Sequence, residues 1–426
     1  DLVCDRDSEG RETLFQYDAE HNLLCRKEKI TDGQYRETHY TCDEKGRCTS
    51  IRDALGNVTL RQYDKNSAHP IRILTPKGEE TDYGYDIVGR RMSIENAYGA
   101  VEMSYNSRNF VTSRIDGEGN ESRWFYDRMG SLTDYCPAKQ WKEQAGGYQY
   151  RYDFLERLVD TVTPLNEHHR QYRNFDGDII RTIHPVSYAQ KGEDGAGARY
   201  DYDKDGNCIR IHYADGGTER RFYDAEGRML KQVMPESYDH KTDDGAGFTY
   251  RYDIRGRLIH VHDPEGNRLR SCEYNGRDQV IREIDGEGKE TLLHYNGLGL
   301  KTREQVSVRK EGECTCYRVI AYRYDRQGNK VEEAYGQQEV ERDADPVSWH
   351  KIRFSYDANN RLILVEDDFG ARMRYAYDCL GSLTLEERTI EEGIVQKIRY
   401  GYNKNGWRIS RTEIIQGNGE KKLAVT

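Results

Sequence analysis

Hydrophobic and polar residues alternate along most of this 426-residue chain. Near the middle of the chain, the odd-numbered positions hold the hydrophobic residues Ile209, Ile211 and Tyr213, and the even-numbered positions hold the polar residues Arg210 and His212. A period of two predicts β-strands with a drier and a wetter face, because successive side chains of a strand point to opposite sides of the sheet. No stretch sustains the 3.6-residue period of a helix, and only eight prolines are present to interrupt strands. We expect an all-β protein.

A short phrase, Tyr-Asp-x-x-Gly-Arg, separates neighbouring strands. In the copy at 252–257, Asp253 is expected to accept hydrogen bonds from the backbone N–H groups ahead of it, and Gly256 to take the positive φ that closes a type I turn. Tyr252 then ends one strand, and the residues after Arg257 begin the next. The residues expected to build the clearest copies of this turn are Tyr85, Asp86, Gly89, Arg90, Tyr202, Asp203, Gly206, Tyr223, Asp224, Gly227, Arg228, Tyr252, Asp253, Gly256, Arg257, Tyr324, Asp325 and Gly328.

A second turn of the same chemistry lies between successive phrases. Asp263-Pro264-Glu265-Gly266 is an example, with Pro at a position that suits its fixed φ. Each repeat unit is therefore expected to hold two strands and two turns. The phrase begins at residues 17, 42, 63, 85, 105, 126, 152, 175, 202, 223, 252, 274, 295, 324, 356, 377 and 402, with Cys42 and Phe175 in the place of Tyr.

The repeat determines the predicted domain organisation. The tight spacing is 21 residues, as between positions 42 and 63, and a constant spacing gives each unit the same contacts with its neighbours. Residues 1–426 are therefore expected to form a single array of about seventeen repeats, truncated at both ends, instead of several separate domains.

Longer spacings mark insertions near residues 135–150, 184–200, 234–250, 306–323 and 335–354. The first three are copies of one another, since each runs from a Pro through a Gly-rich bend into a Tyr-x-Tyr-Asp strand. If the array winds, copies that recur at a fixed interval are expected along one edge.

Composition narrows the range of functions. Hydrophobic residues make up only 35% of the chain, but 33 Tyr supply large rings with a hydroxyl for a partner, so the core is expected to be thin and Tyr-based. A net charge of −10 argues against nucleic acid as a partner, because phosphate binding needs a basic face. The ten Cys lack zinc-type spacing, and most are expected to be free thiols after assembly in the cytoplasm.

The residues that could act in catalysis or bind a metal are better explained by structural roles. The acidic turn at 116–119 resembles a calcium loop, but it lacks the alternating run and terminal Glu of an EF-hand. His168, His169 and His184 fit surface loops better than a metal site. No Ser/His/Asp or Cys/His set can be assembled, so we expect no catalytic residue, no metal and no cofactor, and the chain is predicted not to be an enzyme. The better candidates for surface contacts are aromatic residues of the insertions: Trp141, Tyr148, Tyr188, Tyr238 and Trp349.

The Tyr-Asp-x-x-Gly-Arg phrase, its 20- to 23-residue period and the second turns at 116–120 and 263–267 resemble the RHS or YD-repeat family over essentially the whole chain. The resemblance implies a long antiparallel ribbon, a β-hairpin solenoid that spirals into part of a hollow shell. In bacterial members the shell encloses a C-terminal toxic domain of the same polypeptide, and in teneurins the repeats form a large extracellular barrel.

The same resemblance carries over no catalytic residue. Members that release a cargo use an Asp-Pro-x-Gly motif for autoproteolysis. The only such string here, at 263–266, is followed by more repeats, and Asp345-Pro346 lacks the Gly.

Two functions from different classes remain open. The first is a non-enzymatic shell segment of a secreted RHS-type toxin, with a C-terminal cargo of the same polypeptide as its partner, and an immunity protein and secretion machinery as further partners. The second is a cell-surface adhesion or carbohydrate-binding protein whose inserted loops meet glycans. A cleavable cargo downstream would favour the first, and a wall anchor with glycan binding the second. Both place the protein outside a bacterial cell.

Overall fold

The chain forms one continuous β-ribbon. The computed structural model describes residues 3–7, 10–311, 314–338, 346, 348–391, 393–417 and 420–425. The strands of its first half are β1 (Cys4–Arg6), β2 (Glu12–Tyr17), β3 (Leu23–Thr31), β4 (Gln34–Cys42), β5 (Cys48–Arg52), β6 (Val58–Tyr63), β7 (Pro70–Leu74), β8 (Glu80–Tyr85), β9 (Arg91–Asn96), β10 (Gly99–Tyr105), β11 (Val111–Ile115), β12 (Glu121–Tyr126), β13 (Leu132–Cys136), β14 (Tyr148–Tyr152), β15 (Leu158–Val162), β16 (His168–Arg173), β17 (Ile179–Ile183), β18 (Arg199–Tyr202), β19 (Cys208–His212), β20 (Thr218–Tyr223) and β21 (Met229–Val233).

The strands of its second half are β22 (Tyr238–Asp239), β23 (Asp244–Gly245), β24 (Phe248–Tyr252), β25 (Leu258–His262), β26 (Arg268–Tyr274), β27 (Val280–Asp285), β28 (Glu290–Tyr295), β29 (Lys301–Glu311), β30 (Cys314–Tyr324), β31 (Lys330–Gln338), β32 (His350–Tyr356), β33 (Leu362–Asp367), β34 (Arg372–Tyr377), β35 (Leu383–Glu391), β36 (Ile394–Tyr402), β37 (Arg408–Gly417) and β38 (Glu420–Val425). Short helices interrupt the ribbon at α1 (Ala138–Lys142), α2 (Pro185–Lys191), η1 (Gly192–Asp194) and η2 (Pro235–Ser237).

Antiparallel pairing confirms the predicted all-β class. In the described part of the chain, 36 strands belong to a single sheet in which strands adjacent in sequence pair with each other, from β1 with β2 to β37 with β38. The exception is β21, which pairs with β24 because β22 and β23 form a two-stranded sheet of their own. A tandem repeat of strand, turn and strand is expected to give this pattern, because each unit contacts the units next to it in the sequence.

Each phrase folds into a tight hairpin turn. In the copy at 252–257, the Gly256 N–H donates to Asp253 O at 3.0 Å, and Gly256 has a φ of 81°. Asp253 Oδ1 accepts from the backbone N–H groups of Arg255, at 2.9 Å, and Arg257, at 3.0 Å. The pairing register shifts just before Tyr252, so the turn ends in a bulge. A bulge increases local twist, and repeated twist accumulates into curvature.

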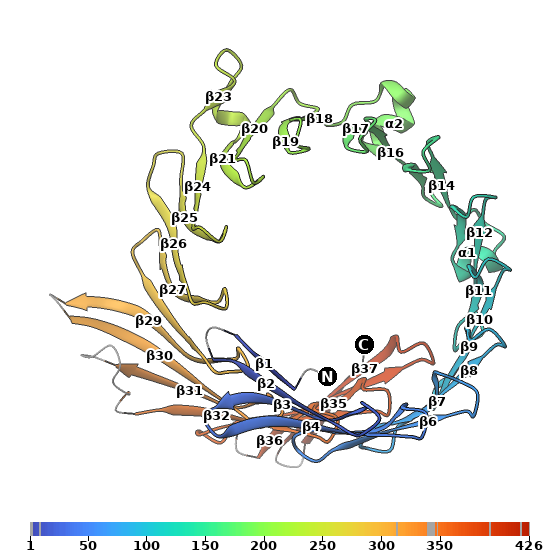
Figure 1. Cartoon of the computed structure of the whole chain (residues 1–426), viewed down its shortest axis with the longest axis vertical. Coiled ribbons are helices and arrows are strands. Elements are labelled where there is room, and N and C mark those ends of the chain that lie inside the picture. Colours follow the sequence, from blue (N-terminus) through green and yellow to red (C-terminus); the bar gives the residue numbers. More distant parts are fainter. Residues whose placement is uncertain are drawn as a thin grey trace.

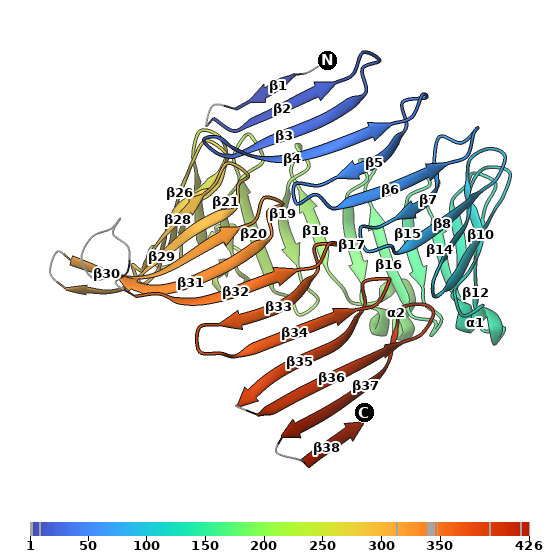
Figure 2. The ribbon, with the colours of Figure 1, turned by 90° about the horizontal axis from the view of Figure 1, so that it is seen from below.

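The ribbon winds into an open spiral. Figure 1 shows the strands arranged as a ring whose centre no element crosses, and Figure 2 shows the C-terminal strands continuing below the N-terminal ones. The phrase at 274 contacts Asp7, in the turn before the first phrase, and the phrase at 402 contacts Glu118, in the turn before the sixth. These are the twelfth and seventeenth phrases, so one coil holds eleven units (12 − 1 and 17 − 6), each with two strands.

The wall is a single layer of sheet with a thin core. Fully buried apolar side chains in the described residues are scattered, and the one buried cluster consists of Leu292, Tyr317 and Val319 with Trp349 against it. Half-buried and exposed side chains still alternate along strands such as β14, as expected, although no second layer among the described residues covers either side of the ribbon. Bonds between neighbouring units must therefore supply much of the stability.

Three of the predicted insertions lie along one edge of the ribbon. α1, α2 and the segment from η2 to β23 each replace a second turn, and Figure 2 shows α1 and α2 at the lower edge. The sequence did not predict these helices, since five and seven residues contain too little of a helical period. Among the described residues, no helix has the length and apolar character of a membrane span.

The two later insertions have different outcomes. Residues 306–323 lie mostly in the long strands β29 and β30, so this stretch lengthens a hairpin instead of adding a separate loop. Asp345 and most of the segment 339–347 lie outside the described residues.

Candidate functional site

The Tyr of each phrase joins its unit to the preceding one. Tyr252 Oη donates to Met229 O at 2.9 Å, and Met229 begins the second strand of the preceding unit. A hydrogen bond of this kind contributes about 1 kcal/mol to stability. The same bond is made by Tyr63, Tyr85, Tyr105, Tyr126, Tyr152, Tyr202, Tyr223, Tyr274, Tyr295, Tyr324, Tyr356, Tyr377 and Tyr402.

The Arg of the phrase joins its unit to the following one. Arg257 Nε donates to Asp253 Oδ2 at 2.7 Å, and Arg257 Nη1 donates to Asn275 O in the next turn at 2.7 Å. Its guanidinium lies 4.8 Å from the centroid of the Tyr274 ring. One planar cation thus binds a carboxylate, a carbonyl and an aromatic face across the unit boundary. Corresponding bonds to the next turn are made by Arg47, Arg90, Arg157 and Arg361.

The remaining predicted turn residues have the same arrangement or a close variant. Asn207 and Asn329 take the place of Arg after Asp203 and Asp325, and each amide donates to the Asp Oδ2 at 3.0 Å. Arg90 and Arg228 bind Asp86 and Asp224 through Nε at 2.6 Å. Positive φ angles are found at Gly89, Gly206, Gly227, Gly256 and Gly328. The structure therefore places these residues at unit boundaries all along the ribbon and does not gather them into one cleft.

These contacts fix the protonation states of the joint. Hydrogen bonds from the backbone and side chain of Arg257 lower the pKa of Asp253, and the hydrogen bond to Asp253 raises the pKa of Arg257. Burial raises the pKa of Tyr252. At neutral pH the Asp is ionised and the Tyr and Arg are protonated, so the joint holds units together and has no group ready to exchange a proton.

One unit differs from the sequence prediction. Phe175, taken as the substitute for Tyr, lies in the turn itself and is 83% exposed. Arg173 occupies the Tyr position, at the register shift that ends β16, and its Nε donates to Leu158 O at 3.3 Å. That carbonyl is the one a Tyr hydroxyl takes in other units. The prediction was wrong because it looked for a ring, whereas in this unit a long side chain with a donor reaches the same carbonyl.

A second set of contacts forms the seam between coils, where phrase turns of the later coil lie on second turns of the earlier one. Tyr98 Oη donates to Asp378 Oδ2 at 2.6 Å, and Lys77 pairs with Asp357 at 3.4 Å. Four further positions complete the series, namely Arg277 with Asp7, Gly297 with Ile30, Gln327 with Ala54 and Lys404 with Glu118. Six successive phrases therefore contact six successive turns.

Two glycines of the seam touch the backbone of the other coil. A Cβ on Gly297 would lie 2.5 Å from Lys29 O, and a Cβ on Gly117 would lie 2.8 Å from Lys404 O. Real Cβ atoms do not approach backbone oxygens so closely, so the coils must separate if either glycine gains a side chain.

The aromatic residues of the insertions contact their own wall. Tyr188 of α2 stacks on His168 with ring centroids 4.4 Å apart, and Trp141 Nε1 of α1 donates to Glu121 Oε2 at 3.2 Å. Tyr148 and Trp349 are half-buried against Tyr135 and the Leu292 cluster, respectively. Tyr238 is half-buried and donates to Asp243 of its own insertion, and Asp243 in turn accepts from Arg210 of β19. These rings hold the loops to the ribbon. Within the described residues, no group of three metal-ligand side chains includes His168, His169 or His184.

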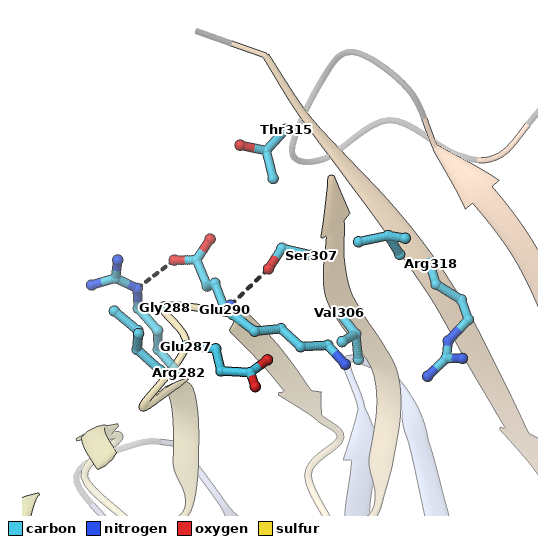
Figure 3. Close-up of a pocket in the computed structure, with 11 residues that line it drawn as sticks. Arg282, Glu287, Gly288, Glu290, Val306, Ser307, Thr315 and Arg318 are labelled. Carbon is cyan, nitrogen blue, oxygen red and sulfur yellow. Dashed lines mark hydrogen bonds and ion pairs between the residues drawn. The ribbon is translucent and has the colours of Figure 1, made fainter. Parts of the chain in front are cut away.

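A hollow of about 640 Å³ lies beside β28, β29 and β30. Figure 3 shows the residues that line it. Arg282 Nε donates to Glu290 Oε1 at 2.6 Å, and Tyr317 Oη donates to Glu290 Oε2 at 2.6 Å. The Glu290 N–H donates to Ser307 Oγ at 2.7 Å. Both carboxylate oxygens have donors, and none of the described lining residues pairs a nucleophile with a base. The hollow has the contacts of a wall and lacks those of an active site.

Sequence reasoning missed the seam, which joins one coil to the next. Its contacts join residues about 280 positions apart, as Tyr98 and Asp378 are. The only local signal would have been a glycine at the second place of a turn, where no positive φ requires one.

Similarity to known proteins agrees with this geometry. No protein-family model matches the chain. Among solved structures, the chain resembles the crystal structure of TcdB2-TccC3-Cdc42, with a TM-score of 0.59 and 14% identity, and that of TcdB2-TccC3 without its hypervariable C-terminal region, with a TM-score of 0.60 and 12% identity. The chain has the fold of TcdB2-TccC3. A Tc holotoxin pore from Photorhabdus luminescens gives a TM-score of 0.58 at 14% identity.

These matches cover 99% of this chain but only 26 or 27% of the TcdB2-TccC3 and holotoxin chains, so it spans about a quarter of their length. A curated relative, double-stranded DNA deaminase toxin A of Burkholderia cenocepacia (strain H111), is 27% identical over 157 residues. That match covers 36% of this chain and 10% of the deaminase toxin.

Proposed function

We propose that this chain is a non-enzymatic wall segment of a secreted RHS-type toxin, and that the wall encapsulates a C-terminal toxic cargo of the same polypeptide. The observation that carries the proposal is the spiral, in which eleven units complete a coil and six turn-to-turn contacts seal one coil on the next.

The size of one coil fits an enclosure. Strands in a sheet lie about 4.8 Å apart, so 22 strands give a circumference of roughly 105 Å and a diameter of roughly 33 Å. Side chains extend about 5 Å inward from each wall, which leaves a bore of roughly 23 Å. Barrels of about eight strands are filled by their own side chains. A coil of 22 strands is too wide to be filled in this way, so it has room for another polypeptide.

The chemistry of the wall also fits a container. Its strands are joined by ion pairs such as Arg72 with Asp82, at 2.5 Å, and charged residues of both signs make up 33% of the chain. Unfolded polypeptides bind exposed apolar patches, and a polar wall of mixed charge gives such a cargo little to adhere to. The wall can therefore confine a cargo without binding it tightly.

The similar proteins support the association with toxins. TcdB2-TccC3 has a structure determined without its hypervariable C-terminal region, and the Burkholderia relative is named a toxin. A variable C-terminal region attached to a constant wall is the arrangement that an exchangeable cargo requires. An immunity protein and secretion machinery are the further partners that such a toxin needs.

The proposal is tested on the natural full-length product, purified from its host without denaturant. The region downstream of the repeats should resist protease while the shell is intact and become sensitive once urea opens the wall. Intact mass under native and denaturing conditions shows whether the cargo is a separate fragment that leaves only on unfolding. A downstream region that is digested from the outset would overturn encapsulation. Binding of such a product to a glycan array would support surface adhesion instead.

A further inference from the structure

We propose that the β3–β4 hairpin carries a binding site for one Zn²⁺ ion, formed by Cys25, Glu37 and His39. No spacing in the sequence indicates this site, because the thiol comes from one strand and the other two groups from the next. The inference does not depend on the proposed shell function.

Strand register places the three side chains on one face of the hairpin. Cys25 pairs directly with His39, and Lys27 pairs with Glu37, so the four form one compact block. Sγ of Cys25, an imidazole nitrogen of His39 and a carboxylate oxygen of Glu37 all lie within 4.8 Å of one another. Ligand atoms around a tetrahedral zinc lie about 3.3–3.8 Å apart, so a small rotation of side chains brings the set to bonding distance.

The three groups form a zinc donor set. Thiolate and imidazole favour zinc over calcium or magnesium, which prefer oxygen ligands alone. Cys25 is 2% exposed, whereas 51% of the His39 side chain is exposed, so an ion would enter past the imidazole and meet the thiol beneath it. A water molecule would complete four-coordination.

The neighbouring cations decide which carboxylate oxygen is available. Lys27 Nζ lies 3.1 Å from Glu37 Oε1, while Glu37 Oε2 faces His39 Nε2 at 3.5 Å. The lysine therefore holds one oxygen and leaves the other for the metal, an arrangement common around metal-bound carboxylates. Arg52 pairs with His39 from β5 and is exposed, so it weakens the attraction for a cation without filling the site.

Zinc binding requires Cys25 as a thiolate. The thiol proton is therefore released to solvent when the metal binds.

A bound ion would strengthen the seam between coils. The same hairpin supplies Arg36, whose Nη1 donates to Gln327 O at 3.3 Å, and Ile30, whose carbonyl accepts from Gly297 N at 2.8 Å. Cross-linking β3 to β4 would hold both contacts in place.

The test is a titration of the metal-free, reduced chain with Co²⁺, which reports thiolate ligation by a charge-transfer band and tetrahedral geometry by visible d–d bands. We expect saturation at one equivalent and displacement by Zn²⁺. Cys25→Ser should abolish the charge-transfer band, and His39→Ala, which removes a ligand, should lower affinity by more than the roughly 10- to 100-fold that loss of an outer-shell partner costs. Cys136→Ser removes another buried thiol and serves as the matched control that keeps the spectrum.

Two results would overturn the proposal. One is the absence of a charge-transfer band in the parent chain at neutral pH. The other is a band that survives both Cys25→Ser and His39→Ala, which would assign the metal to other cysteines. His39 is half-exposed, so its replacement does not endanger folding, and protection of Cys25 from alkylation by Zn²⁺, read by mass spectrometry, provides a second measurement on the unaltered chain.

Discussion

The tetrapeptide Asp-Gly-Glu-Gly occurs twice as a second turn, at 116–119 and at 285–288, and the two copies have different surroundings. Their local geometry is the same. Gly119 N donates to Asp116 O at 2.9 Å, and Gly288 N donates to Asp285 O at 3.1 Å. The φ angles of the two closing glycines are 81° and 82°.

Within the described part of the chain, only the first copy contacts another coil. Glu118 Oε1 accepts from Lys404 N at 2.6 Å, and Asp116 Oδ2 accepts from Asn405 Nδ2 at 2.7 Å. In the second copy, the nearest atom to a Cβ on Gly286 would be Arg268 O at 3.5 Å, an ordinary contact within the same ribbon. The comparison shows that four residues determine a turn, while their place in the array determines whether the turn is part of the seam.

The largest expected effect comes from a methyl group at the seam. Gly117→Ala should destabilise the contact with 403–406 by about 2 kcal/mol, because overfilling a packed site costs roughly 1–3 kcal/mol. Hydrogen exchange at 403–406 should then be roughly 30-fold faster. Gly286→Ala is the matched control and should change exchange and stability by less than about 0.5 kcal/mol. Equal effects of the two substitutions would contradict the assignment of the seam.

Loss of a charge-assisted hydrogen bond should have the next largest effect. The hydrogen bond to Asp378 raises the pKa of Tyr98 to about 12, so the hydroxyl stays a donor at neutral pH. Tyr98→Phe should weaken the seam by about 1.5 kcal/mol. Exchange at 378–381 should accelerate, whereas Tyr213→Phe, which removes a bond to Glu219 within one unit, should leave that region unchanged.

A joint inside the coil should respond differently from the seam. Tyr252→Phe removes the bond to Met229 O and should lower the free energy of urea unfolding by about 1 kcal/mol. Exchange at the seam, for example at 403–406, should not change. A seam that opens in this variant would show that joints and seam are a single cooperative unit.

Protonation by acid should have the smallest effect on stability at any one turn, but the losses add up over the many turns of the ribbon. Bonds from Asn207 to Asp203, and from Arg257 to Asp253, lower the pKa of these carboxyls in the folded chain. Their contribution to stability is complete above the unfolded pKa of about 3.9 and is lost as the pH falls through the lower folded values. The melting temperature should be steady from about pH 7 to 5 and fall below about pH 4, as measured by circular dichroism. A fall that begins near pH 6 would point to histidines instead.

Local chemistry made the ribbon predictable. The Asp at the start of a turn and the Gly at its end act within five residues, so strands and turns such as 252–257 follow from the sequence. The same logic missed Arg173, because the bond to Leu158 O depends on reach and a donor, which two different side chains supply.

Curvature was not predictable in the same way. The small twists of the individual units add up and determine whether eleven or some other number of units completes a coil. The total twist cannot be deduced from any single residue. Contacts such as that of Lys404 with Glu118 exist only once the sum is fixed. Cross-strand register likewise brings together Cys25, Glu37 and His39. Hydrophobic alternation does not determine this register, because a slip of two residues leaves every side chain on the same face.

The offset of eleven units determines what the copied insertions would face. The three copied insertions occur in every second unit, before the phrases at 152, 202 and 252, and all lie along one edge. In the seam, the turn before a phrase lies against the phrase eleven units later, so in a longer spiral these insertions would lie against the eighteenth, twentieth and twenty-second phrases. Phrase turns carry none of the copied insertions, so each inserted helix or loop would meet a short, tight turn, and the adjoining coil would have to accommodate it there.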